Sequence, residues 1–117
     1  MKTLREQSLV DDEEFARLWT ESRNKHNPRS AFAIQRELLS KGLPVELAES
    51  TVAIIDDVDN AYRVGLKISR KLSNANYDTF HRRIFNHLRR KGFTESLSRR
   101  ITIQLWDEKN GNDKSIH

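Results

Sequence analysis

The 117-residue chain fits one domain, and the absence of Cys excludes disulfides, thiolate metal sites and cysteine nucleophiles. Charged residues make up 32% and hydrophobic residues 36% of the chain, with only four Gly and two Pro, a composition typical of amphipathic helices rather than sandwiches or barrels. The net charge of +4 is unevenly divided, because residues 1–58 carry 8 Lys/Arg against 11 Asp/Glu, or −3, and residues 59–117 carry 13 against 6, or +7.

The chain shows no membrane or export signal. No apolar run approaches the roughly 18 residues that cross a bilayer, and the polar start of the chain lacks the apolar stretch of a signal peptide. We therefore expect a cytoplasmic protein that does not associate with membranes, and the lack of Cys agrees with a reducing compartment.

The first predicted helix begins at Asp11, a residue suited to capping, and ends before Pro28, which disfavours the α conformation at the preceding residue. Residues at helical spacing form its expected inward face: Phe15, Leu18, Trp19 and Ser22. Ser30 is the predicted cap of a second helix, and Gly42 supplies the left-handed residue that ends it. The inward residues of that helix are Ile34, Leu38 and Leu39.

The third predicted helix has Pro44 in its first turn and runs to Asp56-Asp57, where a new start can be capped. Its apolar stripe comprises Leu47, Ala48, Val52 and Ile55. The fourth helix continues to a break at residues 73–76, and its expected inward face comprises Val58, Ala61, Tyr62, Gly65, Ser69 and Leu72.

The fifth predicted helix is capped by Asp78 and ended by Gly92. Its buried stripe comprises Phe80, Ile84, Phe85 and Leu88. The sixth helix has an apolar face of Leu97, Ile101 and Leu105, and Trp106 closes it.

The two halves repeat one pattern. Aligning Lys41-Gly42-Leu43 with Lys91-Gly92-Phe93 matches three apolar pairs: Ile34 with Ile84, Leu38 with Leu88, and Leu47 with Leu97. Ala16 also falls on Ala61 once the longer second loop is allowed for. A period of about fifty residues marks a repeat array. We predict an all-α, elongated array of about six helices in tandem three-helix repeats at residues 11–56 and 57–107, with a lead-in at 1–10 that is short enough to be the tail of a missing repeat, and a disordered tail at 108–117.

Several short motifs in this order resemble the RecX family. Residues 11–16 (Asp-Asp-Glu-Glu-Phe-Ala), then Trp19 and Arg23, then Pro28-Arg29, and residues 37–43 (Glu-Leu-Leu-Ser-Lys-Gly-Leu) resemble the family's central repeat. Residues 88–93 (Leu-Arg-Arg-Lys-Gly-Phe) are similar to the end of its last repeat, so the resemblance covers about residues 9–106. The family usually has three such repeats, and this chain carries two.

This resemblance implies a non-enzymatic regulator. It implies binding to the RecA recombinase or to the RecA–DNA filament, inhibition of recombinase activity, and hence regulation of DNA repair and of the SOS response. The residues alone indicate only a basic helical repeat module.

The surplus of cations in the second half is the candidate binding surface. Seven of them cluster on and after the fifth helix: Arg82, Arg83, Arg89, Arg90, Lys91, Arg99 and Arg100. Four more at helical spacing on the fourth helix extend the patch: Arg63, Lys67, Arg70 and Lys71. The favoured interpretation is contact with DNA phosphates or with an acidic groove, and the alternative is an ordinary solvated face.

Other site classes find no support. Five aromatic residues fall on inward stripes and are expected in the core rather than as a base-stacking platform: Phe15, Trp19, Phe80, Phe85 and Phe93. The paired aspartates suit helix starts better than acid–base catalysis, and His81 and His87 lie six residues apart, which does not make a metal pair. We expect no enzyme activity, metal, cofactor or small-molecule substrate.

Two rival functions remain open at this point. A stand-alone basic helical DNA-binding module also predicts a basic second half, but it requires base-edge discrimination rather than a protein partner. A purely structural adaptor makes the charge asymmetry incidental.

Overall fold

The computed structural model describes residues 4–115 of the chain, and the side chains of residues 11–111. Within that range the fold is entirely helical, as predicted, and has no strand. The helices are α1 (Leu4–His26), α2 (Ala31–Ser40), α3 (Val45–Val52), α4 (Asp57–Ser69), the short 3₁₀ helix η1 (Arg70–Leu72), α5 (Tyr77–Arg90) and α6 (Glu95–Ser115). The predicted elongated array of three-helix repeats is confirmed: the principal extents are 70 × 23 × 19 Å.

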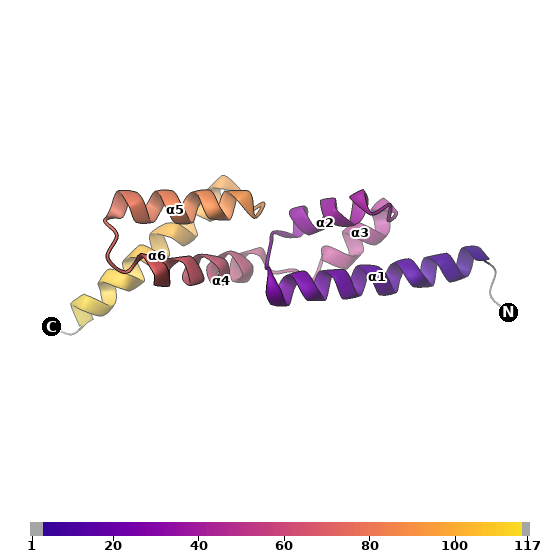
Figure 1. Cartoon of the computed structure of the whole chain (residues 1–117), viewed down its shortest axis with the longest axis horizontal. Coiled ribbons are helices and arrows are strands. Elements are labelled where there is room, and N and C mark those ends of the chain that lie inside the picture. The colour runs from indigo at the N-terminus through magenta and orange to yellow at the C-terminus, as the bar shows by residue number, and fades with distance from the viewer. Residues whose placement is uncertain (1–3, 116–117) are drawn as a thin grey trace.

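The helices form two three-helix units that lie one after the other along the long axis (Figure 1). We call α1–α3 the first unit and α4–α6 the second unit. Each unit has its own apolar core. The core of the first unit comprises Ala16, Ile34, Leu38, Leu43, Ala48 and Val52. The core of the second unit comprises Ala61, Val64, Leu72, Phe80, Ile84, Leu88, Phe93, Ile101 and Leu105.

The glycine turns end α2 and α5 as predicted. Gly42 and Gly92 have φ values of +89° and +96°, the left-handed region that residues with a Cβ rarely adopt. The peptide N–H groups of Leu43 and Phe93 then donate back to Leu38 O and Leu88 O, at 3.3 and 3.2 Å. Both repeats therefore turn in the same way from their second helix into their third.

The predicted inward face of α1 is wrong by part of a turn. Ala16 and Thr20 are buried, whereas Phe15 and Leu18 are 39% and 50% exposed. Trp19 is only half-buried. Small residues face the core here because α1 packs closely against α3, and the larger side chains remain on the flanks.

Three further side chains assigned to apolar stripes lie mainly outside the core. Leu39 is 37% exposed and Val58 is 43% exposed, while Phe85 is half-buried on the flank of α5. Asn60 and Val64 take the inward positions of α4, which the predicted stripe omitted. Each error is a shift of one or two positions around a helix whose apolar stripe is broad.

Helix boundaries differ from the prediction at both ends of the chain. Asp11 is not a cap, because α1 begins at Leu4 and carries Asp11 in its interior. Residues 4–10 are thus helical, and residues 1–3 of the expected lead-in lie outside the described residues. The expected disordered tail from residue 108 is wrong as far as Ser115, because α6 continues to that residue.

Two of the predicted caps are confirmed and one moves. Ser30 Oγ accepts from Ala33 N at 3.0 Å. Asp56 caps α4 by accepting from Asp59 N at 3.1 Å. Asn76, rather than Asp78, caps α5, because its side chain accepts from the N–H of Thr79, three residues on.

Hydrogen bonds of the buried Asn60 and of Asp57 connect α4 to the first unit. Asn60 is 1% exposed, and its Nδ2 donates to Asn24 Oδ1 at 2.7 Å and to Arg29 O at 3.1 Å. Asp57 Oδ1 accepts from Ala31 N at 2.8 Å, so this carboxylate binds the start of α2 in the neighbouring unit. The second aspartate of the pair therefore serves the junction between units.

The turn between α5 and α6 forms the other half of this junction. Ser30 N donates to Lys91 O at 3.1 Å, and Lys91 Nζ donates to Asn27 Oδ1 at 2.6 Å. A Cβ on Gly92 would lie 2.5 Å from Ser30 Oγ and 2.7 Å from Ala33 Cβ. Gly92 is therefore required both for its backbone conformation and for the close approach of the two units.

Candidate cationic binding groove

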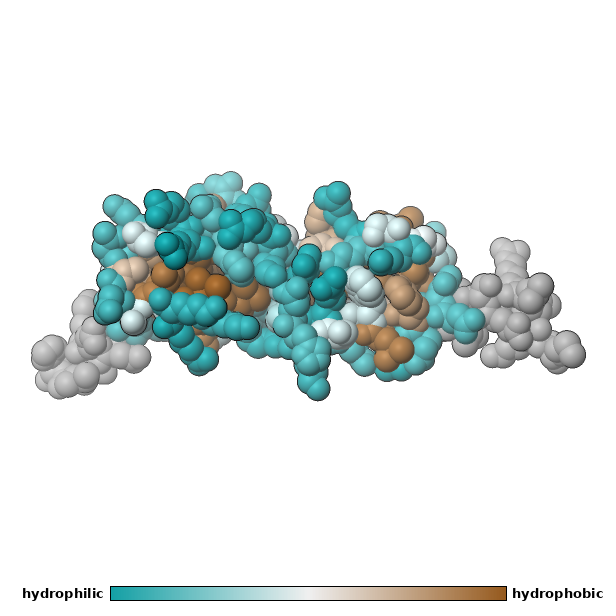
Figure 2. All heavy atoms as spheres, in the orientation of Figure 1, coloured by the Kyte–Doolittle hydropathy of each residue, from teal (hydrophilic) through white to brown (hydrophobic). Residues whose placement is uncertain are grey.

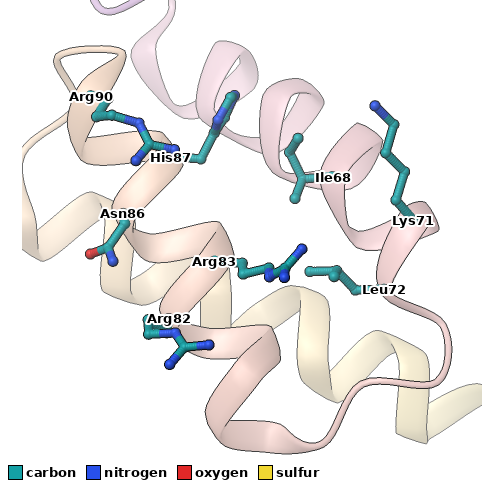
Figure 3. Close-up of a pocket in the computed structure, with 8 residues that line it drawn as sticks. All are labelled: Ile68, Lys71, Leu72, Arg82, Arg83, Asn86, His87 and Arg90. Atoms are coloured by element: carbon teal, nitrogen blue, oxygen red, sulfur yellow. The ribbon is translucent and has the colours of Figure 1, made fainter.

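A positively charged groove runs between α4 and α5. It consists of two hollows of about 410 and 400 Å³ that share the side chains of Ile68, Lys71 and His87. Ile68 and Leu72 supply its apolar floor, and the cations line its sides. Figure 3 shows Arg83 and His87 on α5 facing Ile68 and Leu72 across this space. We call it the cationic groove.

Helical spacing brings the basic side chains of the groove to one side of each helix. Arg83, His87 and Arg90 follow one another at intervals of four and three residues along α5. Lys67 and Lys71 are four residues apart, on α4 and η1. Because α4 and α5 pack side by side, the two rows line opposite sides of the same groove.

The groove collects seven of the eleven predicted cations: Arg63, Lys67, Lys71, Arg82, Arg83, Arg90 and Lys91. Among the described residues that line it, none is acidic. Apolar surface shows between hydrophilic side chains over the second unit (Figure 2). A polyanion or an acidic protein surface is the chemical class of ligand that such a groove favours.

The other four predicted cations lie outside this groove. Arg89 donates to Phe93 O at 2.6 Å, so it binds the carbonyl of the α5–α6 turn. Arg99 pairs with Glu95 at 2.7 Å and lies over the Phe85 ring. Arg100 is exposed on α6, and Arg70 is exposed on η1. The cluster predicted from sequence is thus divided between two faces of the second unit.

Two groove cations also hold the junction between the units. Arg63 pairs with Asp59 at 3.1 Å and donates to Asn24 O at 3.1 Å. Burial lowers the pKa of Lys91, and the nearby charges of Arg29 and Arg23 lower it further. The end of the groove at the unit boundary is therefore formed by two cations, Arg63 and Lys91, that also bind residues of the first unit.

His87 lies where the two hollows meet. Burial is the main cause that lowers its pKa, and the positive charges of Lys91, Arg90 and Lys71 act in the same direction. The imidazole is thereby held neutral at pH 7 in the empty groove, and a phosphate placed among these cations would favour its protonation.

The first unit contributes to the groove through the end of α1, which sequence reasoning missed. Lys25, His26, Asn27 and Pro28 line the second hollow together with Lys67 and Lys71. The sequence showed Asn27-Pro28 only as a helix stop, because nothing local indicates which residues a helix end will meet in space. The groove thus spans both units.

The residues that carry the family resemblance in the first unit meet at Glu37. Its Oε1 accepts from Trp19 Nε1 at 2.9 Å and from Arg23 Nε at 3.0 Å, and its Oε2 pairs with Arg29 at 3.0 Å. Lys41 Nζ lies 5.1 Å from the centre of the Trp19 ring. These motif residues therefore fix α1 against α2 around a half-buried carboxylate, and their role in this structure is architectural.

Within the described part of the chain, no three His, Asp or Glu side chains gather closely enough to hold a metal ion. None of the described helices has a stretch of the length and apolarity needed to cross a bilayer.

Known proteins resemble this chain over most of its length. Residues 11–52 match the family description "RecX, second three-helix domain". A "Regulatory protein RecX" of Listeria monocytogenes (strain EGD-e) is 27% identical over 111 residues, which cover 92% of this chain and 41% of the relative. Its counterpart in Streptomyces coelicolor is 30% identical over 106 residues, covering 88% of this chain and 56% of the relative. No solved structure matches significantly.

The fold and the groove define a tandem three-helix-repeat protein with a cationic surface shared by two units. The matched domain and these relatives identify the family: the chain belongs to the RecX family. It spans about half the length of the curated relatives that it matches.

Proposed function

We propose that this chain is a non-enzymatic regulator that binds the RecA–DNA filament, through the cationic groove, and inhibits recombinase activity. It acts in the cytoplasm, and its effect is to restrain recombination and the SOS response. Membership of a family whose members are named regulatory proteins supports the regulatory role. The single observation that supports the surface is the continuous groove lined by seven cations of the second unit and by Lys25 of the first.

The chemistry of the groove suits a filament that carries DNA. Each Lys or Arg that neutralises a phosphate releases condensed counterions, which gives affinity without base recognition. The apolar floor at Ile68 and Leu72 adds a surface that excludes water beneath the ligand. Groove-wide charge and shape are sufficient for a filament regulator, whereas a sequence reader needs contacts to base edges.

A stand-alone DNA-binding module is the second candidate, and the same groove favours it. The two candidates differ in their dependence on RecA. A filament regulator binds RecA-coated DNA more tightly than bare DNA and suppresses the DNA-dependent ATPase of RecA. A stand-alone module binds bare duplexes at least as well and discriminates between their sequences.

The test compares two charge-reversed double variants of the second unit. Arg83→Glu with Arg90→Glu replaces two cations that line the first hollow of the groove. Arg99→Glu with Arg100→Glu removes the same charge from exposed positions on α6 outside the groove. Filament binding, RecA ATPase and strand exchange are measured for wild type and both variants over a salt titration, with helicity checked by circular dichroism.

We expect the groove variant to lose filament binding and ATPase suppression, and the α6 variant to keep both. The slope of log affinity against log salt should flatten by about 0.9 per lost phosphate contact on duplex DNA and about 0.7 on single strands. Equal losses in the two variants would indicate diffuse attraction and contradict the groove. A wild-type chain that leaves RecA ATPase and strand exchange unchanged would contradict the function itself.

A further inference from the structure

We propose that the first unit carries a second binding surface, a groove between α1 and α3. This groove accepts an amphipathic helix of a protein partner, and the partner helix presents a large apolar side chain flanked by Lys or Arg. This surface is separate from the cationic groove. It deepens the proposed function by naming a site that binds a protein rather than DNA. The inference depends on the proposed function only for the identity of that protein partner.

The groove is open and partly apolar. It encloses about 320 Å³ between Arg17, Thr20 and Glu21 on α1 and Leu47 on α3. Ile54, in the turn after α3, forms one edge and is 84% exposed, more than any other large apolar residue described. A single exposed Ile is ordinary on a surface, but here it borders a hollow large enough for side chains of a ligand.

The second unit contains the same groove in a filled form. Ala16 and Ala61 are both fully buried and correspond in the repeat, so Thr20 of α1 corresponds to Gly65 of α4. At Gly65 the α6 side chain of Leu105 lies so close that an added Cβ would be 2.7 Å from its Cδ1. The third helix of that unit therefore packs fully along the first.

The lengths of the third helices explain why only one groove is filled. α6 has 21 residues, and beyond Leu105 it reaches Tyr62, whose hydroxyl donates to Glu108 Oε1 at 2.7 Å. α3 has only 8 residues and ends at Val52. It therefore has no counterpart of Glu108 that reaches Arg17, the position that corresponds to Tyr62. Arg17 remains 53% exposed and pairs within its own helix. The fold thus leaves the hollow beside Arg17 uncovered in the first unit.

The charges around the open groove select the partner. Arg17 is already shared between Glu14 and Glu21, at 2.7 and 3.1 Å, and Glu13 adds a further carboxylate to the lining. The rim is therefore acidic, which disfavours DNA and favours Lys or Arg beside an apolar anchor. An amphipathic helix in a groove is a common mode of protein recognition.

The inter-unit contacts leave this groove free. They are made by the far end of α1, the start of α2 and the turn at Lys91 and Gly92. Stacking of one unit on the next therefore does not occupy the α1–α3 groove, and a ligand there can bind at the same time as a ligand in the cationic groove.

A labelled peptide tests the surface directly. The probe is a fluorescein-labelled helical peptide of about 18 residues, or five turns. Its Leu residues are spaced three and four apart so that they share one face, and Lys residues flank that face. The control peptide has Glu in place of Lys. Fluorescence anisotropy is measured with wild type, with Ile54→Glu, and with Phe32→Glu. Phe32 is the matched control because it is a 63% exposed apolar residue of the same unit that does not line the groove.

We expect the Lys peptide to bind wild type, Ile54→Glu to weaken it by about tenfold or more, and Phe32→Glu to change it by less than about twofold. Glu21→Lys should also weaken it, and Glu49→Lys, an exposed position outside the lining, should not. Three results would overturn the proposal: equal losses in the paired variants, equal binding of the Glu peptide, or no binding to wild type. RecA ATPase is scored separately, so failure of this surface leaves the cationic groove to its own test.

Discussion

Individual residues in this protein have different roles in the two repeats even where the sequence motif is the same. Gly42 and Gly92 illustrate this difference. Both have the left-handed backbone that ends a helix, but an added Cβ meets nothing within 4 Å at Gly42 and meets Ser30 and Ala33 at Gly92. One glycine is required by its turn, and the other by its turn and by the neighbouring unit.

We predict that Gly92→Ala destabilises the protein more than Gly42→Ala. Each substitution forces an L residue into the left-handed region, at about 1–2 kcal/mol, and only the change at position 92 adds overpacking of about 1–3 kcal/mol. Urea denaturation followed by circular dichroism gives both free energies of unfolding. Equal losses would show that the two units do not approach closely at Gly92.

At His87 the sign of the pKa shift fixes the pH dependence. The folded pKa is lowered, mainly by burial and then by Lys91, Arg90 and Lys71, so the folded protein without ligand binds fewer protons than the unfolded chain. Stability linked to His87 is present above the unfolded pKa of about 6.5 and is lost as the pH falls through the folded pKa.

We predict that a polyanion in the groove favours the protonated form of His87, so that the polyanion binds together with a proton on this side chain. DNA or filament affinity should therefore rise as the pH falls from about 7.5 to about 6, and His87→Gln should flatten this dependence. Affinity is measured by anisotropy across that range at constant ionic strength. An identical pH profile in the variant would show that His87 does not face the ligand.

At the scale of helices, the buried positions are set by the contacts between elements as well as by periodicity. Leu38 and Leu88 are both fully buried and correspond in the repeat, whereas Leu39, which periodicity also placed inward, is 37% exposed. The apolar stripe of a short helix allows neighbouring residues to compete for the inward position, and the packing of α2 on α3 selects Leu38.

We predict that Leu38→Ala and Leu88→Ala each cost about 2–5 kcal/mol of folding free energy, the usual range for a buried large-to-small change. Leu39→Ala, on the exposed flank of the same helix, should cost less than about 1 kcal/mol. Midpoints of urea denaturation compare the three variants. If Leu39→Ala matched Leu38→Ala, the packing of α2 described above would be wrong.

At the scale of the whole molecule, two cores are joined by a small polar junction. Asn60 is buried at this junction and donates to Asn24 and to the carbonyl of Arg29. In repeat proteins, stability is approximately the sum of the unit stabilities and of the interface between neighbours. The relative position of the units, and therefore the continuity of the cationic groove, depends on this interface.

We predict that Asn60→Ala weakens the coupling between the units more than it weakens either core. Asn24 and the carbonyl of Arg29, which belong to half-buried residues, each lose a hydrogen-bond donor, at about 1–3 kcal/mol in total. Hydrogen exchange with mass spectrometry follows the peptides that contain Leu38 and Leu88. The opening free energies of the two units should be similar in wild type and should separate in the variant, and similar values in both proteins would contradict a junction held by Asn60.

The sequence by itself determined the all-helical class, the two repeats, the glycine turns, the Ser30 cap and the presence of a cationic second half. These features depend on local rules: the helical period, the backbone freedom of glycine and the spacing of charges. The tertiary structure alone decided which cations share a groove, because Arg89 and Arg99 bind within their own unit while Lys25 and His26 join from α1. It also decided that Asp57 serves the neighbouring unit and that the short α3 leaves a groove open, because both depend on how helices distant in sequence pack together.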